Sequence, residues 1–297
     1  MEFLDLTEAG GIAASNLALC LHKPSSAAAR RRFAALLEHA PEVVEAYQST
    51  HSTIAEGTLK RRRFMASFLA GAPGELTFIG LYEVAGWEDL SAQALDAMPA
   101  MARMKAAMED RSFAEEGRGR ALFDLRPDGR LIDLRGRAVV ADPGSRAYMR
   151  RAETTPLPIL ELRRTPRLAP PMPPWTEFAL AAPEIADLPR DWAAALAEWR
   201  GIYLITDESD GARYVGSAYG AENLLGRWRA HVAREAGVTV GLADRDPASF
   251  RFSILDRLSP DAPAEEVIRV EQTWMERLHT VRFGLNRPGA DNRPSIA

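Results

Sequence analysis

The chain of 297 residues lacks several features that would direct it to other functional classes. Its single cysteine, Cys20, excludes a disulfide within the chain and a cysteine metal cluster, so we expect a reduced, cytoplasmic protein. No apolar run reaches the length of a membrane-spanning helix. The first residues are acidic where a secretory signal is basic. The sequence therefore predicts no membrane association.

Excess positive charge is also absent. The formal net charge is -4, which argues against nucleic-acid binding over the whole surface but leaves room for a local basic groove. Arginine matches phosphate oxygens well, although a compositional bias explains the many arginines equally well. The candidate phosphate contacts are Lys60, Arg61, Arg62, Arg63 and Arg229. A solvated helix face is an equally good interpretation of the cluster at 60–63.

Proline is concentrated in one place, the stretch TPRLAPPMPPW at 165–175. Such a run cannot continue a helix or a central strand and behaves as a stiff spacer. We therefore predict three parts: a first domain at 1–164, a Pro-rich linker at 165–185 and a second domain at 186–297.

The N-terminal part has the pattern of a mixed domain. Helices are predicted at 26–39, 41–50 and about 91–109, and a strand at 75–87. Pro127-Asp128-Gly129 between apolar alternations predicts a hairpin, and PILELRR adds a strand. Four or five strands with two or three helices suggest an α+β, barrel-like domain, by strand count comparable with PUA-like domains.

The C-terminal part is simpler. A short helix is predicted at 188–200, followed by a hairpin with its turn in DESDG. A helix at about 221–235, a strand at 250–255 and a helix at about 262–279 follow. This order predicts a three-stranded antiparallel sheet flanked by helices, so the fold class is α+β.

One acidic residue lies on the apolar face of the last predicted helix. Val267, Glu271, Trp274 and Leu278 are four, three and four residues apart, so they share a face. Glu271 is therefore expected to point inward. A carboxylate in that position requires a cation, a metal ion or several donors. An ion pair with an arginine is the simplest explanation on periodicity alone.

Arg227 and His231 are one turn apart on the predicted helix at 221–235. Such a pair suits phosphate contact and proton transfer, although a solvated face is the usual explanation. Tyr203 and Tyr214 flank the hairpin turn, so their rings should lie close together.

Gly201 and Gly216 would leave room for close approach of backbone or ligand. Alone, each of these features is more often structural than catalytic.

Together, these residues resemble the GIY-YIG nuclease superfamily over about residues 200–288, most of all its homing-nuclease type. The first motif is Gly201-Ile202-Tyr203, and the second is Tyr214-Val215-Gly216 after ten intervening residues. The resemblance assigns catalytic positions to Tyr203, Tyr214, Arg227, Glu271 and Asn286, and His231 is a further catalytic candidate, for proton transfer. One departure is the segment 235–247, which contains no histidine where many relatives carry one.

The resemblance implies hydrolysis of a DNA phosphodiester with one divalent cation, Mg²⁺ or Mn²⁺, held by Glu271. Arg227 would neutralise charge on the phosphate oxygens. Tyr203 or Tyr214 would activate water, with positive charge from Arg227 and the cation lowering the tyrosine pKa.

We accordingly expect a restriction or defence endonuclease whose partner is DNA and which could act as an oligomer. The first domain would recognise DNA, modified or unmodified, through a pocket of aromatic residues drawn from Phe78, Tyr82, Trp87 and Tyr148. The alternatives are a mobile-element or repair nuclease, and a DNA-binding regulator that kept the scaffold without turnover.

Overall fold

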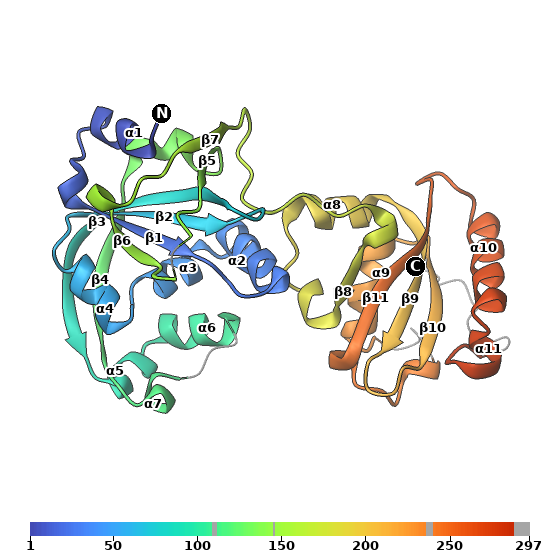
Figure 1. The fold of residues 1–297 in the computed structure, drawn as a ribbon. Helices are drawn as coiled ribbons and strands as arrows, with labels where there is room; N and C mark the ends of the chain where they lie inside the picture. Colours follow the sequence, from blue (N-terminus) through green and yellow to red (C-terminus); the bar gives the residue numbers. More distant parts are fainter. Residues whose placement is uncertain (109–111, 145, 236–239, 288–297) are drawn as a thin grey trace. The chain divides into compact units, whose positions relative to one another are not determined.

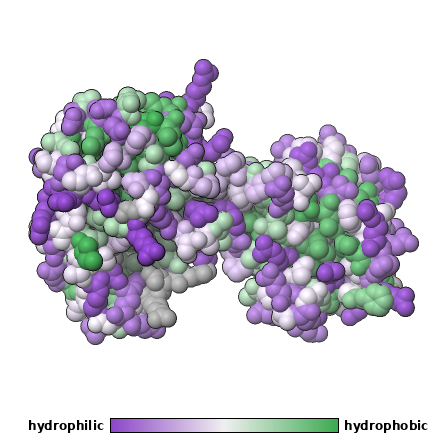
Figure 2. Space-filling view, viewed as in Figure 1, coloured by the Kyte–Doolittle hydropathy of each residue, from purple (hydrophilic) through white to green (hydrophobic). Residues whose placement is uncertain are grey.

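The computed structural model describes residues 1–108, 112–144, 146–235 and 240–287. The chain divides into two compact units, Met1–Pro170 and Pro171–Ala297 (Figure 1). None of the helices in the described ranges combines the length and the apolar character that a membrane crossing requires. Figure 2 shows hydrophilic residues over much of the visible face of each unit, with smaller apolar areas between them.

The first unit is built on a curled, mixed sheet of seven strands. At its centre β1 (Leu17–His22) and β2 (Phe64–Ala70) run parallel, and the other neighbouring strands are antiparallel. The order is β6–β1–β2–β3–β5–β7, and β4 pairs with the second half of β3. The remaining strands are β3 (Glu75–Leu90), β4 (Arg120–Pro127), β5 (Ala138–Ala141), β6 (Met149–Arg151) and β7 (Ile159–Leu162). In the described chain β6 and β7 do not pair, so the expected barrel-like domain is an open, curled sheet.

The helices expected in this unit are confirmed. The first is α2 (Ala27–His39), whose N-cap Ser26 accepts a hydrogen bond from the Ala29 amide at 3.0 Å. The second is α3 (Pro41–Gln48), and the segment 91–109 holds both α5 (Ala92–Asp96) and α6 (Pro99–Met108). The other helical segments are α1 (Phe3–Ala9), η1 (Ala14–Asn16), α4 (Thr53–Leu59), α7 (Phe113–Glu116), η2 (Gly129–Leu134) and η3 (Ala152–Thr154).

The prediction of a hairpin at Pro127-Asp128-Gly129 is wrong. β4 and β5 both pair with β3 and not with each other, because the chain between them forms η2. The Asp128 carboxylate starts this helix by accepting a hydrogen bond from the Arg130 amide at 3.0 Å. As a result, residues 78–81 of β3 have no strand beside them on this side among the described residues.

The second unit contains an antiparallel sheet in the order β10–β9–β11–β8. The three expected strands are confirmed as β9 (Arg200–Asp207), β10 (Arg213–Ala218) and β11 (Phe250–Leu258). A fourth, β8 (Ala179–Ala181), lies inside the segment 165–185 that we interpreted as linker. Phe178 and Leu180 in this segment are buried in the core of the unit, so its latter part is folded.

Helices cover both faces of this second sheet. The expected ones are α8 (Arg190–Glu198), α9 (Asn223–Val232) and α10 (Ala264–Arg277), all confirmed. Trp192 of α8 and Trp228 of α9 pack on one face, and Val267 of α10 packs with Ile202 and Val215 on the other. The remaining segments are η4 (Trp175–Glu177), η5 (Ala182–Ile185), η6 (Val240–Leu242), η7 (Pro247–Ser249) and α11 (Thr280–Phe283).

Candidate active site

The two tyrosines of the hairpin lie over the same glycine. In the antiparallel register Tyr203 is opposite Gly216, and Tyr214 is opposite Ile205. A Cβ added to Gly216 would lie 2.5 Å from Tyr203 Cζ and 2.7 Å from Tyr214 Cε1. Glycine is therefore required at position 216, because both rings occupy the space that any side chain would need.

His231 approaches the tyrosines from α9. It is 4% exposed, its Nε2 is 2.7 Å from Tyr203 Oη, and its ring centroid is 5.8 Å from that of Tyr214. Burial, and then the positive charge of Arg227, lowers the pKa of His231 from 6.5 to about 3. The imidazole is therefore neutral at pH 7 and can accept a hydrogen bond.

Arg227 lies one turn before His231 and reaches the same phenol. Its guanidinium is partly buried and within hydrogen-bonding reach of Tyr203 Oη. Burial acts to lower the pKa of Arg227, but Tyr203, Tyr214 and Glu271 outweigh burial and raise it. Because arginine only donates hydrogen bonds, Tyr203 Oη accepts from Arg227 while its own proton points to His231 Nε2.

Burial raises the pKa of Tyr203 and outweighs Arg227, which acts to lower that pKa as we expected. Burial is the main cause, and the nearby Tyr214 adds to it, while Arg227 opposes both. Tyr203 is fully enclosed, so the loss of hydration of a phenolate outweighs the attraction of one guanidinium. In the free protein this side chain is a neutral phenol.

Glu271 enters the site from α10. It is 4% exposed and follows Val267 on the inward face, so the expected orientation is confirmed. α10 packs on β10 and β9, and the Glu271 carboxylate is close enough to act on the pKa values of both Tyr203 and Arg227. A guanidinium, an imidazole and two phenols therefore meet beside Gly216, and the Glu271 carboxylate acts on two of them electrostatically from α10, on the other face of the sheet.

Two other expected site residues hold strands in place. Both polar atoms of the Asn286 amide bind the Val215 main chain: Oδ1 accepts from its N–H at 2.9 Å, and Nδ2 donates to its carbonyl at 2.8 Å. Asn286 thus extends the edge of β10 and is fully buried. A Cβ on Gly201 would lie 2.7 Å from the Asp256 carbonyl and 3.3 Å from Leu224, so this glycine allows close packing.

The loop at 235–247, which contains no histidine, is attached to the hairpin turn by Arg245. Its guanidinium lies 2.6 Å from Asp207 and 2.9 Å from Asp210. Burial acts to raise the pKa of Asp207, but hydrogen bonds from Ser209 and Arg245 lower it far below the usual range. Residues 236–239 of this loop lie outside the described residues.

Most basic residues predicted to contact phosphates have acidic partners. The pairs are Lys60–Asp89 at 2.8 Å, Arg62–Glu153 at 2.5 Å, Arg63–Glu83 at 3.2 Å and Arg229–Glu222 at 3.4 Å. Arg61 is exposed. A phosphate at these places would have to compete with a carboxylate, and such surface pairs cost about 0–1 kcal/mol to break.

The aromatic residues predicted to form one pocket separate into two places. Phe78 and Tyr82 line a pocket in the first unit, whereas Trp87 is 47% exposed beside Lys60 and Tyr148 donates and accepts hydrogen bonds with Ser52. The polar residues that line this pocket, Glu45, Asp128 and Arg135, were not predicted from the sequence. Gly80 within a predicted strand was the one available signal, because glycine inside a strand often marks an irregularity.

No protein-family model matches the chain, and no curated protein matches it either. A solved structure that it matches is the catalytic domain of intron endonuclease I-TevI, in a mutant form. The identity is 26%, the match covers 30% of this chain and 92% of that one, and the TM-score is 0.26. A TM-score this low carries no argument about fold or function, so the site is interpreted from its own residues.

Proposed function

We propose that the protein is a metal-dependent DNA endonuclease that hydrolyses phosphodiester bonds with a GIY-YIG type of site. The observation that supports this most is the meeting of Arg227, His231 and Tyr203 beside Gly216, with Glu271 acting on two of them from the other face of the sheet. Buried charges are costly, so a carboxylate and a guanidinium kept together beside titratable side chains indicate a functional site. The motif resemblance specifies phosphodiester cleavage among the possible reactions.

The residues fit a single Mg²⁺ or Mn²⁺ held by Glu271. Mg²⁺ in phosphate-processing enzymes is typically bound by one or two carboxylates with water and phosphate oxygens. The described residues hold no cluster of three or more His, Cys, Asp or Glu side chains, so Glu271 would be the protein ligand of such an ion. When bound, the cation supplies Lewis-acid polarisation of the phosphate and stabilises the leaving oxygen.

Tyr203 and His231 form the proton path. Once substrate binding admits a water to the enclosed Tyr203 Oη, that water can lose its proton to the phenol oxygen as the phenol proton crosses the 2.7 Å hydrogen bond to His231 Nε2. In the free site burial disfavours the imidazolium, and so does Arg227. A bound phosphate partly neutralises Arg227, which removes part of that opposition. Proton transfer is thus coupled to the presence of substrate.

Arg227 then has two functions. Its guanidinium donates to Tyr203 and stays charged, so it can also donate to a non-bridging phosphate oxygen as negative charge develops there. Both contacts are made from one side chain on α9. A phosphate bound by Arg227 would therefore lie near the Tyr203 phenol.

The biological setting that we propose is restriction or defence, with the first unit recognising DNA. A site of this kind cuts one strand at a time, so a double-strand break requires two protein copies or two encounters. In the first case the protein would act as an oligomer on the DNA. A repair or mobile-element nuclease has the same chemistry and differs in its DNA target.

The decisive experiment is cleavage of DNA by the Glu271→Gln variant in Mg²⁺. We expect a loss of at least about 100-fold in the single-turnover rate, because Lewis-acid stabilisation contributes several kcal/mol. Glu276→Gln is the matched control, since Glu276 is exposed on the same helix, and it should cut like the wild type. Wild-type cutting by Glu271→Gln would refute the assignment, and DNA binding without cutting by the wild type in Mg²⁺ and in Mn²⁺ would favour a regulator.

A further inference from the structure

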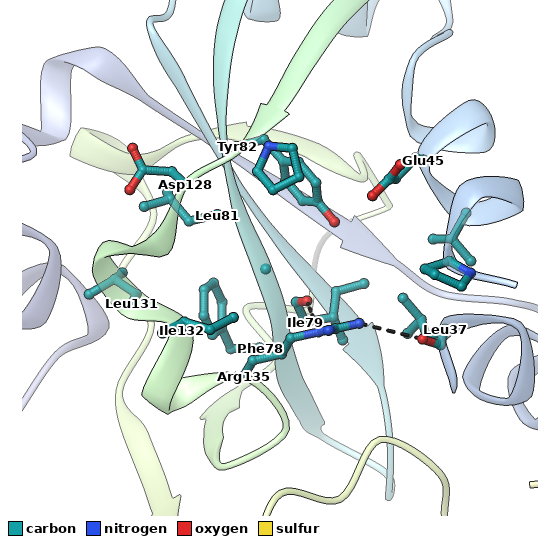
Figure 3. A pocket seen from close by; sticks show the side chains of 14 residues that line it. Leu37, Glu45, Phe78, Ile79, Leu81, Tyr82, Asp128, Leu131, Ile132 and Arg135 are labelled. Atoms are coloured by element: carbon teal, nitrogen blue, oxygen red, sulfur yellow. Dashed lines mark hydrogen bonds between the residues drawn. The ribbon is translucent and has the colours of Figure 1, made fainter. Parts of the chain in front are cut away.

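The first unit has a pocket where its sheet is split. β3 pairs with β5 through Glu75–Thr77 and with β4 from Tyr82 onward, and η2 crosses the gap between them. The pocket lies in this gap, between η2 on one side and α3 on the other (Figure 3). It is open to solvent and has a cavity volume of about 100 Å³, so it suits a group smaller than a drug-sized ligand.

The split is a built feature, because the main-chain groups along it are paired. The Phe78 carbonyl accepts from the Gly136 amide at 2.8 Å, and the Leu81 carbonyl accepts from the Asp128 amide at 2.8 Å. Between them the Ile79 carbonyl accepts from Arg135 Nε at 3.0 Å. These bonds replace the missing strand and keep the gap open.

The polar groups in the walls are mainly acceptors. Glu45 is exposed at the α3 side, and Asp128 is held 2.6 Å from Arg130 on the η2 side. Figure 3 shows the Tyr82 hydroxyl and the Glu45 carboxylate turned toward the same part of the pocket. Arg135, the cation in the lining, donates from Nε to the Ile79 carbonyl and from Nη2 to the Leu37 carbonyl, so two of its donors serve the fold.

The Tyr82 hydroxyl is held in position from behind. Gln48 Nε2 donates to it at 3.2 Å, and Gln48 Oε1 lies 3.2 Å from His22 Nε2 and accepts from Ser67 Oγ. Gln48 is fully buried, so this floor of the pocket is rigid. Because Tyr82 Oη accepts from Gln48, its own proton is available for an acceptor on the pocket side.

We propose that this pocket binds one nucleobase bearing an exocyclic amino group, cytosine or adenine, turned out of the DNA stack. The inference rests on the proposed nuclease function. Asp128 is neutralised by Arg130, so the exposed Glu45 is the carboxylate that repels the phosphate backbone and accepts N–H donors, and Asp and Glu pair with the amino group of cytosine. The Tyr82 proton suits the adjacent ring nitrogen or carbonyl, and Ile132, 58% exposed at the rim, suits a ring face.

The test uses the full chain without divalent metal, so that DNA is bound but not cut. Binding to duplexes with a single bulged C, A or T is measured by fluorescence anisotropy, because a bulged base costs little to turn outward. We expect the C and A bulges to bind about tenfold or more tighter than the T bulge. Glu45→Leu should abolish this preference, whereas Glu42→Leu on the exposed side of the same helix should retain it.

The outcomes separate this inference from the proposed function. Equal affinity for all three bulges, or an unchanged preference in Glu45→Leu, overturns the pocket assignment even if the protein cuts DNA in Mg²⁺. Failure to bind any of the duplexes overturns the pocket assignment, whereas the proposed function is decided separately by cleavage in Mg²⁺. A preference for C and A that disappears in Glu45→Leu supports the pocket whatever the result of the Glu271→Gln cleavage experiment.

Discussion

Each unit contains a buried tyrosine whose ring lies over a glycine and whose hydroxyl contacts a buried polar side chain. In the first unit Tyr82 covers Gly80, where an added Cβ would lie 3.1 Å from the ring. In the second unit Tyr203 covers Gly216 with even less space. The same local device has different consequences, because the partners of the two hydroxyls differ in charge.

The partner of Tyr82 is the neutral amide of Gln48, backed by Ser67, His22 and Cys20. Burial lowers the pKa of His22 to about 4 and raises the pKa of the Cys20 thiol, so both are uncharged at pH 7. The partners of Tyr203 include a permanent cation, and Glu271 is close by. A neutral network makes a rigid floor, whereas a network with opposite charges can move a proton.

The largest effect should come from removing the hydroxyl that connects substrate and imidazole. Tyr203→Phe keeps the ring but breaks the 2.7 Å contact with His231, so we expect single-turnover DNA cleavage to fall by about 10²–10⁴-fold. Tyr148→Phe, which removes a hydroxyl bound to Ser52 in the first unit, should keep the wild-type rate. Equal losses in the two variants would contradict the proton path.

A smaller loss should follow from displacing the rings without removing any polar atom. Gly216→Ala places a methyl group where Tyr203 and Tyr214 lie, so both rings must shift, and a displacement of about 1 Å costs roughly 100-fold in rate. Gly220→Ala is the matched control, since a Cβ there meets nothing within 4 Å. Normal cleavage by Gly216→Ala, with circular dichroism showing an intact fold, would show that ring position is unimportant.

The smallest effect is a difference in acid sensitivity between the units. Burial lowers the pKa of two histidines in the first unit, His22 to about 4 and His51 to about 3. In the second unit burial lowers the pKa of His231 to about 3. Below about pH 6.5 each of these histidines binds a proton in the unfolded chain but not in the folded one. The free energy of unfolding therefore falls as the pH drops, by roughly 1.4 kcal/mol per histidine per pH unit. Between pH 6.5 and 5 the first unit should therefore lose more hydrogen-exchange protection.

Hydrogen exchange with mass spectrometry resolves the two units in the intact chain. The comparison stays above pH 5 to avoid the titration of Asp207. The lowered pKa of Asp207 stabilises the second unit, and this contribution is lost only as the pH falls through the pKa of unfolded aspartate, near 4. Parallel loss of protection in both units would contradict the assignment of buried neutral histidines.

Elements with a clear amphipathic period were predictable. α2, α3, α9 and α10 each carry a polar and an apolar face, so their sequences reveal both type and approximate ends. β1 and β2 were missed, because LALCLH and FMASFLA lie between packed layers and are buried along nearly their whole length. Such strands show no alternation and cannot be distinguished from a helix core by period.

The sequence by itself determined the order of chemical groups in the second unit and the inward direction of Glu271, because helical spacing and motif order are local properties. Only the tertiary structure decided that the Asn286 side chain hydrogen-bonds to the main chain of β10 and that burial keeps Tyr203 neutral. It also decided that Pro127-Asp128-Gly129 opens a split in the sheet instead of closing a hairpin. These outcomes depend on which strands pair and on how much water is excluded from each side chain. Both are set by contacts between distant parts of the chain, so a local stretch of sequence does not determine them.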